Sequence, residues 1–375
     1  MKKVAFLLDG FGNRRHYFQI LALKEAGFDP KIITFEEAKE GYLHAKRIPK
    51  DFFIILPFSR RMIMKKFSIG FARALLRVLK EESIQIVLTH RYKLLRYLWF
   101  SKLFHPDLKI IFHMVIAEAI KGWHQKFWFK RFKKYIDKIL VNSKALKEEL
   151  INKNLVREDE VEILYSGVDV NEFEVPHSKK EAREIFEIGN DAFIFGMIAQ
   201  FRKEKDQKGL IQALKILRDK GYKVKLVLAG NGPKLEEAIR LSEKLKVKEE
   251  VIFLGKIDPL KVPLLLKAFD AFVYATFREG MPLAVLEAMA AGLPIVATDA
   301  EGIPDIFQSK RKFGYMIPKG NIEKLAEAME ELLNLPEKER LEMGKEAKER
   351  IKEAFSLENL KEHTLKIFQN LTDLN

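Results

Sequence analysis

The sequence predicts an α/β protein made of two doubly wound domains, each with a parallel sheet covered by helices on both faces. Three observations lead to this fold class. Short apolar runs without a helical period alternate with amphipathic stretches along most of the chain. The pattern restarts after the polar, proline-containing stretch 173–177. The length agrees, because 375 residues at roughly 150 per domain correspond to two or three domains.

The first half begins with a short apolar run at 4–8, which predicts a buried strand. A glycine-bearing turn, Gly10-Phe11-Gly12, follows it, and an amphipathic stretch over 14–26 predicts a helix that ends at Gly27. Further strands are expected at 31–35, 84–89, 109–113 and 138–141, with helical segments between them. We expect this first domain to span residues 1–175.

The second half repeats the alternation. Strands are expected at 193–199, 223–230, 251–254, 271–274 and 294–298, and helices at 209–220, 233–246, 259–268 and 282–291. Residues after 317 are predicted to be helical, so the second domain is expected over 176–355. Ligands of such sheets lie beyond the carboxyl ends of the strands, and two domains facing each other would enclose a cleft.

Composition excludes several classes of site and location. The chain has no cysteine, which excludes disulfides, Cys-ligated zinc and thiol nucleophiles. No run approaches the ~18 uncharged apolar residues of a membrane-spanning helix. The apolar start of the chain is interrupted at Asp9, earlier than the apolar region of a signal peptide, so a strand is the better interpretation.

Positive charge is concentrated in the first half. Residues 1–175 carry 33 Lys and Arg against 21 Asp and Glu, whereas residues 176–375 carry 34 against 32. The first half is therefore expected to face an anionic partner.

The strongest motif runs from residue 278 to residue 298. Glu279 stands in a loop after a strand, Gly280 permits close backbone approach, and Pro282 is expected to open a helix. The N–H groups of Met281–Leu283 and the helix dipole would then form an anion site suited to a diphosphate. Glu287 lies about 7.5 Å further along the helix.

The two glutamates are therefore spaced to contact two parts of one extended ligand, such as a sugar and a ribose. The alternative is that Glu279 is a solvated loop residue and Glu287 a surface helix residue. Small and apolar neighbours surround Glu287, where an unpaired carboxylate would be costly, and this favours a binding role.

A second cluster, residues 199–205, directly follows a predicted strand and contains Arg202 and Lys205. Cations there would neutralise the charge that builds on a departing diphosphate. A solvated loop is the alternative. No Asp-x-Asp sequence occurs, although a metal-bridged diphosphate usually needs such carboxylates. We therefore expect neither a metal ion nor a separate cofactor.

The segment from Glu279 to Glu287 resembles the Glu-x7-Glu signature of the family 4 retaining glycosyltransferases, which have the two-domain GT-B fold. Further landmarks of that family occur in the expected order at 167–169, 230–233, 253–255, 288–299 and 302–304. The resemblance is close from about Ile163 to the end and looser before it.

The resemblance implies roles for individual residues. Glu287 would bind the donor ribose, Glu279 would contact hydroxyls of the transferred sugar, and the backbone around Ile257 would lie against the nucleobase. Gly230 belongs to the Gly-Asn-Gly-Pro landmark. The family's Arg-plus-Lys pair is matched at Lys205.

The family's arginine position, however, is occupied by Gln200, and Arg202 is the candidate replacement. Gly10 and Gly12 would approach the donor phosphates. His113 resembles the family's histidine near the donor sugar, and His90 is similarly placed; a structural role is the alternative for both histidines.

Two segments of the first half, 60–67 and 121–135, interleave Lys and Arg with large apolar and aromatic residues. Three interpretations stay open: aromatic core with solvated charges, binding to an anionic membrane surface, or binding to nucleic acid.

The expected function is metal-independent transfer of a sugar, with retention, from a UDP-, GDP- or ADP-sugar to an envelope glycan or lipid-linked acceptor, such as a lipopolysaccharide core. The last helix, about 356–375, is expected to return to the first domain. We expect a cytoplasmic protein, peripheral on the inner face of the membrane. The alternatives are a GT-B epimerase or phosphorylase, and a non-catalytic nucleic-acid-binding protein.

Overall fold

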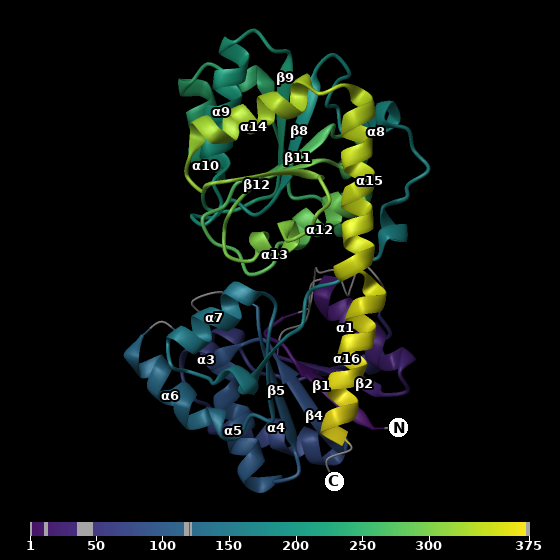
Figure 1. Cartoon of the computed structure of the whole chain (residues 1–375). Helices are drawn as coiled ribbons and strands as arrows, with labels where there is room; N and C mark the ends of the chain where they lie inside the picture. Colours follow the sequence, from purple (N-terminus) through teal and green to yellow (C-terminus); the bar gives the residue numbers. More distant parts are fainter. Residues whose placement is uncertain (1, 11–13, 36–47, 116–119, 121, 373–375) are drawn as a thin grey trace. The chain divides into compact units, whose positions relative to one another are not determined.

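The computed structural model describes residues 2–10, 14–35, 48–115, 120 and 122–372 (Figure 1). The chain divides into two compact units: unit 1 is Met1–Ser166 with Leu357–Asn375, and unit 2 is Gly167–Ser356. The division lies earlier than the expected boundary after residue 175. The backbone N–H of Val168 donates to the carbonyl of Phe355 at 2.9 Å, which attaches this segment to unit 2.

Unit 1 contains a parallel sheet of seven strands in the order β3-β2-β1-β4-β5-β6-β7. The strands are β1 (Lys3–Leu7), β2 (Asp29–Thr34), β3 (Phe53–Ile55), β4 (Ile84–Thr89), β5 (Lys109–Met114), β6 (Lys138–Val141) and β7 (Val161–Ile163). Strands β3 and β7 were not predicted, because three residues are too few for a recognisable pattern.

Helices cover both faces of this sheet. They are α1 (Arg14–Glu25), α3 (Arg60–Lys65), α4 (Ile69–Glu81), α5 (Leu95–Phe104), α6 (Trp123–Lys133), α7 (Lys144–Asn152) and α16 (Leu357–Thr372), with short 3₁₀ turns η1 (Lys50–Phe52), η2 (Tyr92–Leu94) and η3 (Glu158–Glu160). Alternate residues of β1 enter different cores: Phe6 packs on the α1 side and Leu7 on the α4 side.

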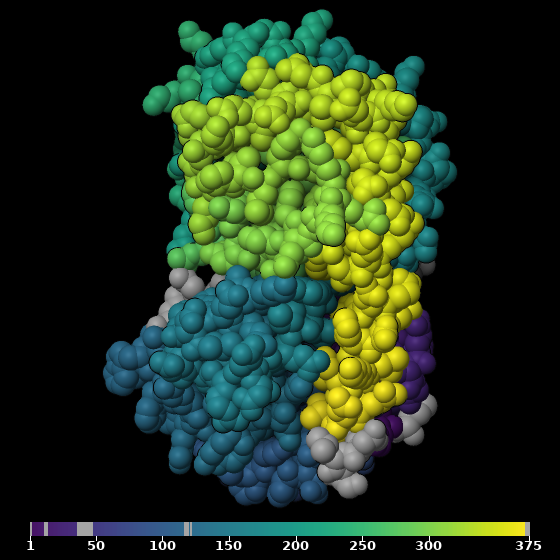
Figure 2. All heavy atoms as spheres, viewed as in Figure 1, coloured from purple at the N-terminus to yellow at the C-terminus, as the bar shows by residue number. Residues whose placement is uncertain are grey.

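Helix α16, the last of the chain, packs against α1 in unit 1 (Figure 1). Leu360 and Phe368 enter the same core as Phe6, and Lys361 forms an ion pair with Glu25 at 2.6 Å. The outer side of α16 lies at the surface in the space-filling view (Figure 2). The C-terminal segment therefore completes a face of the N-terminal sheet.

Unit 2 contains a parallel sheet of six strands in the order β10-β9-β8-β11-β12-β13. The strands are β8 (Phe193–Ile198), β9 (Val224–Ala229), β10 (Val251–Gly255), β11 (Ala271–Tyr274), β12 (Ile295–Thr298) and β13 (Gly314–Ile317). Every residue of β11 and β12 is buried, which explains their unbroken apolar sequences. The edge strand β13 was not predicted.

The helices of unit 2 are α8 (Lys179–Ile185), α9 (Gln207–Asp219), α10 (Leu235–Lys244), α11 (Val262–Lys267), α12 (Leu283–Ala290), α13 (Ile303–Phe307), α14 (Ile322–Asn334) and α15 (Glu337–Ala354), with 3₁₀ turns η4 (Val170–Phe173), η5 (Lys248–Glu250) and η6 (Pro259–Lys261). Pro233 lies outside α10, in a turn where Lys234 donates its N–H to the carbonyl of Phe201 at 3.1 Å. The prediction that Pro233 opens the helix was wrong.

The prediction of two doubly wound parallel sheets is confirmed. In each sheet the strand order reverses once, between β1 and β4 in unit 1 and between β8 and β11 in unit 2. Ligands of this fold bind beyond the carboxyl ends of the strands at such a reversal. No helix within the described residues combines the length and the apolar composition needed to cross a bilayer.

Candidate active site

The loop that follows β11 carries Glu279 at the reversal point of the unit 2 sheet. Gly302 holds this loop from behind, because its N–H donates to the carbonyl of Glu279 at 3.2 Å. A Cβ atom on residue 302 would lie 1.5 Å from the carbonyl oxygen of Gly280, so only glycine fits. The N–H of Glu279 donates to the Glu301 carboxylate at 3.0 Å. The backbone of Glu279 is therefore fixed on two sides.

Glu279 belongs to a cluster with Lys205 and Tyr274. The Lys205 ammonium donates to the Tyr274 hydroxyl oxygen at 2.7 Å and forms an ion pair with Glu279. The Tyr274 hydroxyl donates to the Glu279 carboxylate at 3.0 Å. The Lys205 side chain is 15% exposed and that of Glu279 is 19% exposed, while Tyr274 is buried. Tyr274 is a site residue that the sequence analysis missed.

Backbone pairing between two loops brings Lys205 to Glu279. Lys205 forms an isolated antiparallel bridge with Thr276. On either side of that bridge, Asp206 donates to the carbonyl of Ala275 at 3.0 Å and Phe277 donates to the carbonyl of Glu204 at 2.8 Å. The loops after β8 and β11 meet because these strands are neighbours in the sheet.

Burial, followed by the charge of Glu279, raises the pKa of the Tyr274 hydroxyl well above its usual value. The Glu287 carboxylate adds to the same effect, so Glu287 lies close enough to act on Tyr274. Tyr274 is therefore a neutral hydrogen-bond donor at physiological pH, bonded to Glu279 and within electrostatic reach of Glu287.

Helix α12 begins one residue later than predicted. Pro282 precedes the helix in an extended conformation, with φ −75° and ψ 104°, and is buried with Met281. The first intrahelical bonds run from Val285 and Leu286 to the carbonyl of Pro282. The N–H groups of the preceding turn form the positive end of the helix dipole, and Glu287 stands half-buried further along the same helix.

The other residues predicted in unit 2 lie in the connections that follow β8, β9 and β10. Arg202 is exposed and lines, with Lys205, a hollow of about 450 Å³ whose other cations are Lys203, Lys208 and Lys234. Ile257 is half-buried in the connection after β10. Within the described part of the chain, Arg202 forms no hydrogen bond or ion pair with Glu279, so of the predicted pair of cations Lys205 alone is paired with this glutamate.

Gly230 lies where only glycine is tolerated. Its φ is +144°, and a Cβ atom would lie 2.0 Å from the carbonyl oxygen of Ala199. Its N–H donates to the carbonyl of Gly255 at 2.7 Å. Gly230 thus packs the connection after β9 tightly between those after β8 and β10.

In unit 1, the predicted His113 and His90 lie together with a third histidine, His16. Buried His113 contacts Gln19 through its Nδ1 atom at 3.3 Å, and its ring centroid is 4.9 Å from that of His90. His90 Nδ1 lies 3.2 Å from His16 Nε2. In the described part of the chain, the Nε2 atoms of His90 and His113 have no hydrogen-bond partner.

These imidazoles are neutral. Burial lowers the pKa of His113 and His90 well below the ordinary value of 6.5. Burial also lowers the pKa of His16 to about 3, although part of this side chain still reaches solvent. The cluster can therefore exchange hydrogen bonds with hydroxyl groups but carries no charge at neutral pH.

The turn after β1 lies at the reversal point of the unit 1 sheet. In sequence it shortly precedes His16 of the histidine cluster. Gly10 directly follows Asp9, whose carboxylate pairs with Arg60 at 3.1 Å and with Arg91 at 2.8 Å. Gly12 lies outside the described residues. Asp9 therefore holds two arginines from other segments of unit 1 at the end of β1.

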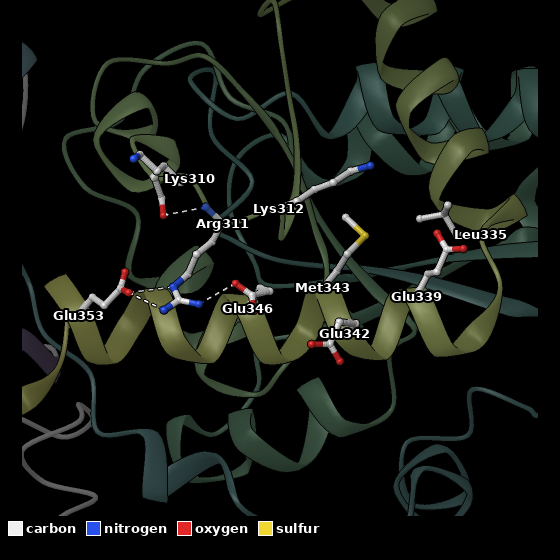
Figure 3. A pocket seen from close by; sticks show the side chains of 10 residues that line it. Lys310, Arg311, Lys312, Leu335, Glu339, Glu342, Met343, Glu346 and Glu353 are labelled. Carbon is white, nitrogen blue, oxygen red and sulfur yellow. Dashed lines mark hydrogen bonds and ion pairs between the residues drawn. The ribbon is translucent and has the colours of Figure 1, made fainter.

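A larger hollow of unit 2, about 720 Å³, lies elsewhere, along α15 (Figure 3). Its central cation, Arg311, is already paired with Glu346 at 2.7 Å and with Glu353 at 2.6 Å. It contains none of the predicted site residues. Size alone therefore does not identify the site.

Comparison with known proteins places the chain in one family. The family described as Glycosyltransferase Family 4 matches residues 17–172, and the one described as Glycosyl transferases group 1 matches residues 178–350. The capsular polysaccharide biosynthesis glycosyltransferase CapM of Staphylococcus aureus is 29% identical over 225 residues, covering 58% of this chain and 57% of CapM.

The N-acetyl-alpha-D-glucosaminyl L-malate synthase of Bacillus anthracis is 31% identical over 223 residues, covering 58% of this chain and 56% of that protein. The matched region is thus less than two thirds of either relative. The structure of Anabaena Alr3699/HepE in complex with UDP and glucose aligns over 100% of both chains, with a TM-score of 0.83 at 17% identity.

At 17% identity that likeness concerns the fold, which is GT-B as the sequence resemblance implied. The two family matches follow each other along the chain and together cover most of it. The chain belongs to the family 4 glycosyltransferases.

Proposed function

We propose that the chain transfers a sugar, with retention of its anomeric configuration, from a nucleotide diphosphate sugar to an acceptor hydroxyl. The observation that carries the proposal is the Lys205–Tyr274–Glu279 cluster beside the start of α12. It combines a cation, a neutral donor and a carboxylate at the reversal point of the sheet. These are the groups that a diphosphate and a sugar require.

The diphosphate binds at the N-terminal turn of α12, where N–H groups and the helix dipole favour an anion. Lys205 then exchanges part of its pairing with Glu279 for the distal phosphate, and Arg202 adds charge from the neighbouring turn. Glu279, released from Lys205, accepts hydrogen bonds from sugar hydroxyls. Glu287 accepts those of the ribose, and the backbone around Ile257 contacts the base.

In the transfer step, the bond between the anomeric carbon and the diphosphate oxygen breaks while the acceptor oxygen bonds to the same face of that carbon. The acceptor's proton passes to the departing diphosphate. Lys205 and Arg202 stabilise the negative charge that develops on this leaving group. No protein side chain is assigned as a general base.

We also propose that this reaction needs no metal ion, because the helix N–H groups together with Lys205 and Arg202 would supply the positive charge that the diphosphate needs. Full activity after exhaustive chelation is the expected result. Loss of activity with EDTA, restored by Mg²⁺ or Mn²⁺, would contradict it. Formation of a sugar phosphate without nucleotide would instead indicate a phosphorylase.

Thermal unfolding with UDP, GDP and ADP tests the donor site. One of the three is expected to stabilise the protein by about 2.7 kcal/mol at 100 times its Kd, which raises the midpoint by roughly 5–10 °C. Glu287→Ala is expected to abolish the shift. Glu342→Ala, an exposed glutamate of α15, is the matched control. No shift with any of the three would overturn the proposal.

For the acceptor, we propose an envelope glycan or a lipid-linked glycan. The name of CapM refers to a capsular polysaccharide, whereas that of the Bacillus anthracis enzyme refers to malate, so relatives differ in acceptor. The basic first half of the chain favours an anionic surface. Sugar transfer to membrane extracts but not to malate would support this acceptor class.

A further inference from the structure

Three segments of unit 1 that contain no acidic residue form one surface. Residues 60–67, 92–104 and 122–135 hold twelve Lys and Arg and no Asp or Glu. They form α3, η2 with α5, and α6, and we call them the α3–α5–α6 surface. A cavity of about 410 Å³ is lined by residues from all of these elements. The surface is therefore uniformly basic and contains a hollow.

The aromatic residues of this surface divide into two groups. Phe129 and Tyr97 are fully buried, as the core interpretation requires. In contrast, Trp123 is 71%, Phe127 60% and Trp128 47% exposed. Exposed tryptophan and phenylalanine on one helix are typical of a face that contacts a bilayer interface.

The cavity is apolar inside and basic at its edge. Its apolar walls include Phe67, Trp99, Trp128 and Phe132, and its cations are Lys65, Lys93 and Arg96. The volume falls in the range of about 300–1,000 Å³ that small-molecule sites occupy. This combination suits an amphiphile with a hydrocarbon chain and an anionic head.

Contacts within α6 and between the elements preform the cavity. The ring of Trp128 stacks on that of Phe132 at 5.6 Å, and Phe67 stacks on Tyr97 at 5.0 Å. The Tyr92 hydroxyl donates to the carbonyl of Gln125 at 2.9 Å, which ties α6 to η2. The walls of the cavity are thus fixed by contacts within the protein, and their apolar rings favour a hydrocarbon chain.

The cavity also lies near the carboxyl ends of the strands. Tyr92 and Lys93 closely follow β4, the strand that leads to His90. Helix α6 follows β5, the strand that contains His113. A lipid held in the cavity would therefore place its head toward the edge of the sheet where ligands of this fold bind.

We propose that this cavity binds one hydrocarbon chain of an anionic membrane lipid, with Lys65, Lys93 and Arg96 at its head group and Trp123 and Phe127 in the bilayer interface. The proposal specifies where a lipid-linked acceptor would bind. The catalytic role of the bound lipid rests on the proposed function. The binding event itself does not depend on the nucleotide site.

The positions of the chain's three tryptophans provide a direct test. Trp99 and Trp128 line the cavity, and Trp123 does not. In full-length Trp123→Phe protein, only the two cavity tryptophans fluoresce. Phosphatidylglycerol carrying bromine on its acyl chain, in phosphatidylcholine vesicles, is expected to quench them, whereas the unbrominated lipid is not.

Two further variants test the chemistry of the cavity. Lys65→Glu combined with Lys93→Glu is expected to weaken binding to these vesicles at least about tenfold. Trp128→Leu is expected to weaken the quenching of Trp99. The variant is still expected to float with the vesicles, because Trp123 and Phe127 still insert into the bilayer interface. Leu341→Ala, an exposed apolar residue of unit 2, is the control that leaves both signals unchanged.

Vesicle binding without quenching of Trp99, measured in protein that carries both Trp123→Phe and Trp128→Phe, would overturn the cavity assignment, because only the exposed face with Phe127 would then be inserted. Binding of single-stranded oligonucleotides but not of vesicles would overturn it in favour of nucleic acid. The nucleotide-dependent thermal shift, measured on the same variants, is expected to persist. Its loss in wild-type protein would contradict the proposed function and leave the lipid result standing.

Discussion

At the residue scale, Tyr274 is the least predictable member of the candidate site. It ends β11, an apolar strand whose residues are all buried, and nothing in that run distinguishes it from a core aromatic. In the structure its hydroxyl bonds both Lys205 and Glu279. Tyr274 thus supports an ion pair that Lys205 and Glu279 also form directly.

Tyr274→Phe keeps the ring and removes the hydroxyl. The net worth of such hydrogen bonds is about 0.5–1.5 kcal/mol each, so kcat/KM is expected to fall roughly tenfold. Because the anion site on α12 is unchanged, the nucleotide-dependent thermal shift is expected to stay close to wild type. Steady-state kinetics beside Tyr315→Phe, a half-buried tyrosine of β13, would measure this, and unchanged kcat/KM would contradict it.

The histidine cluster predicts a pH dependence of stability. Burial lowers the folded-state pKa of His113 below the ordinary 6.5, so the unfolded chain takes up a proton at a higher pH than the folded chain does. The stability contributed by the neutral ring is present above pH 6.5 and is lost as the pH falls below that value. The limiting slope is about 1.4 kcal/mol per pH unit for one histidine.

Urea unfolding of wild type and His113→Gln between pH 7 and pH 5 measures this contribution. The variant is expected to lose less stability per pH unit than wild type. His124→Gln removes an exposed histidine of α6 and is the control, with a slope like that of wild type. Parallel curves for wild type and His113→Gln would refute the assignment of the pH dependence to His113.

At the element scale, the position of the loop before α12 depends on close backbone packing between Gly302 and Gly280. Gly302→Ala would bring a methyl group to within 1.5 Å of a backbone oxygen of Gly280, so the loop has to move. Glu279 moves with it, and we expect loss of activity and of the nucleotide-dependent thermal shift. Gly70→Ala, where a Cβ atom has only ordinary contacts, is the control and is expected to retain both.

The short strands show where element-level prediction ends. Strands such as β4 and β11 are recognisable because they are buried runs of apolar residues. The edge strand β3, by contrast, has three residues and no fully buried one. It exists because β2 offers it a backbone partner, which is not a local property.

At the scale of the whole molecule, the chain begins and ends in the same unit. Leu360, Ile367 and Phe368 of α16 lie in the core that also contains Phe6 of β1. Truncation after residue 356 would expose this core. Each large apolar side chain that loses its burial costs about 1.5–3 kcal/mol, so unit 1 is expected to unfold or aggregate.

Circular dichroism and limited proteolysis of the truncated protein would show this outcome. Unit 2 lies entirely within the truncated chain, so its fragment is expected to stay protected and to keep its nucleotide-dependent thermal shift. A truncated chain in which unit 1 unfolds at the wild-type midpoint would show that α16 is dispensable.

The sequence by itself determined the two parallel sheets, most strand and helix positions and the spacing of Glu279 and Glu287. These features follow from hydrophobic periodicity, turn residues and motif spacing, which act between neighbours along the chain. Only the tertiary structure decided that Tyr274 joins Lys205 to Glu279 and which aromatic residues of α6 are exposed. Such contacts depend on loops and helices that are distant in sequence, and no local pattern encodes which of them meet.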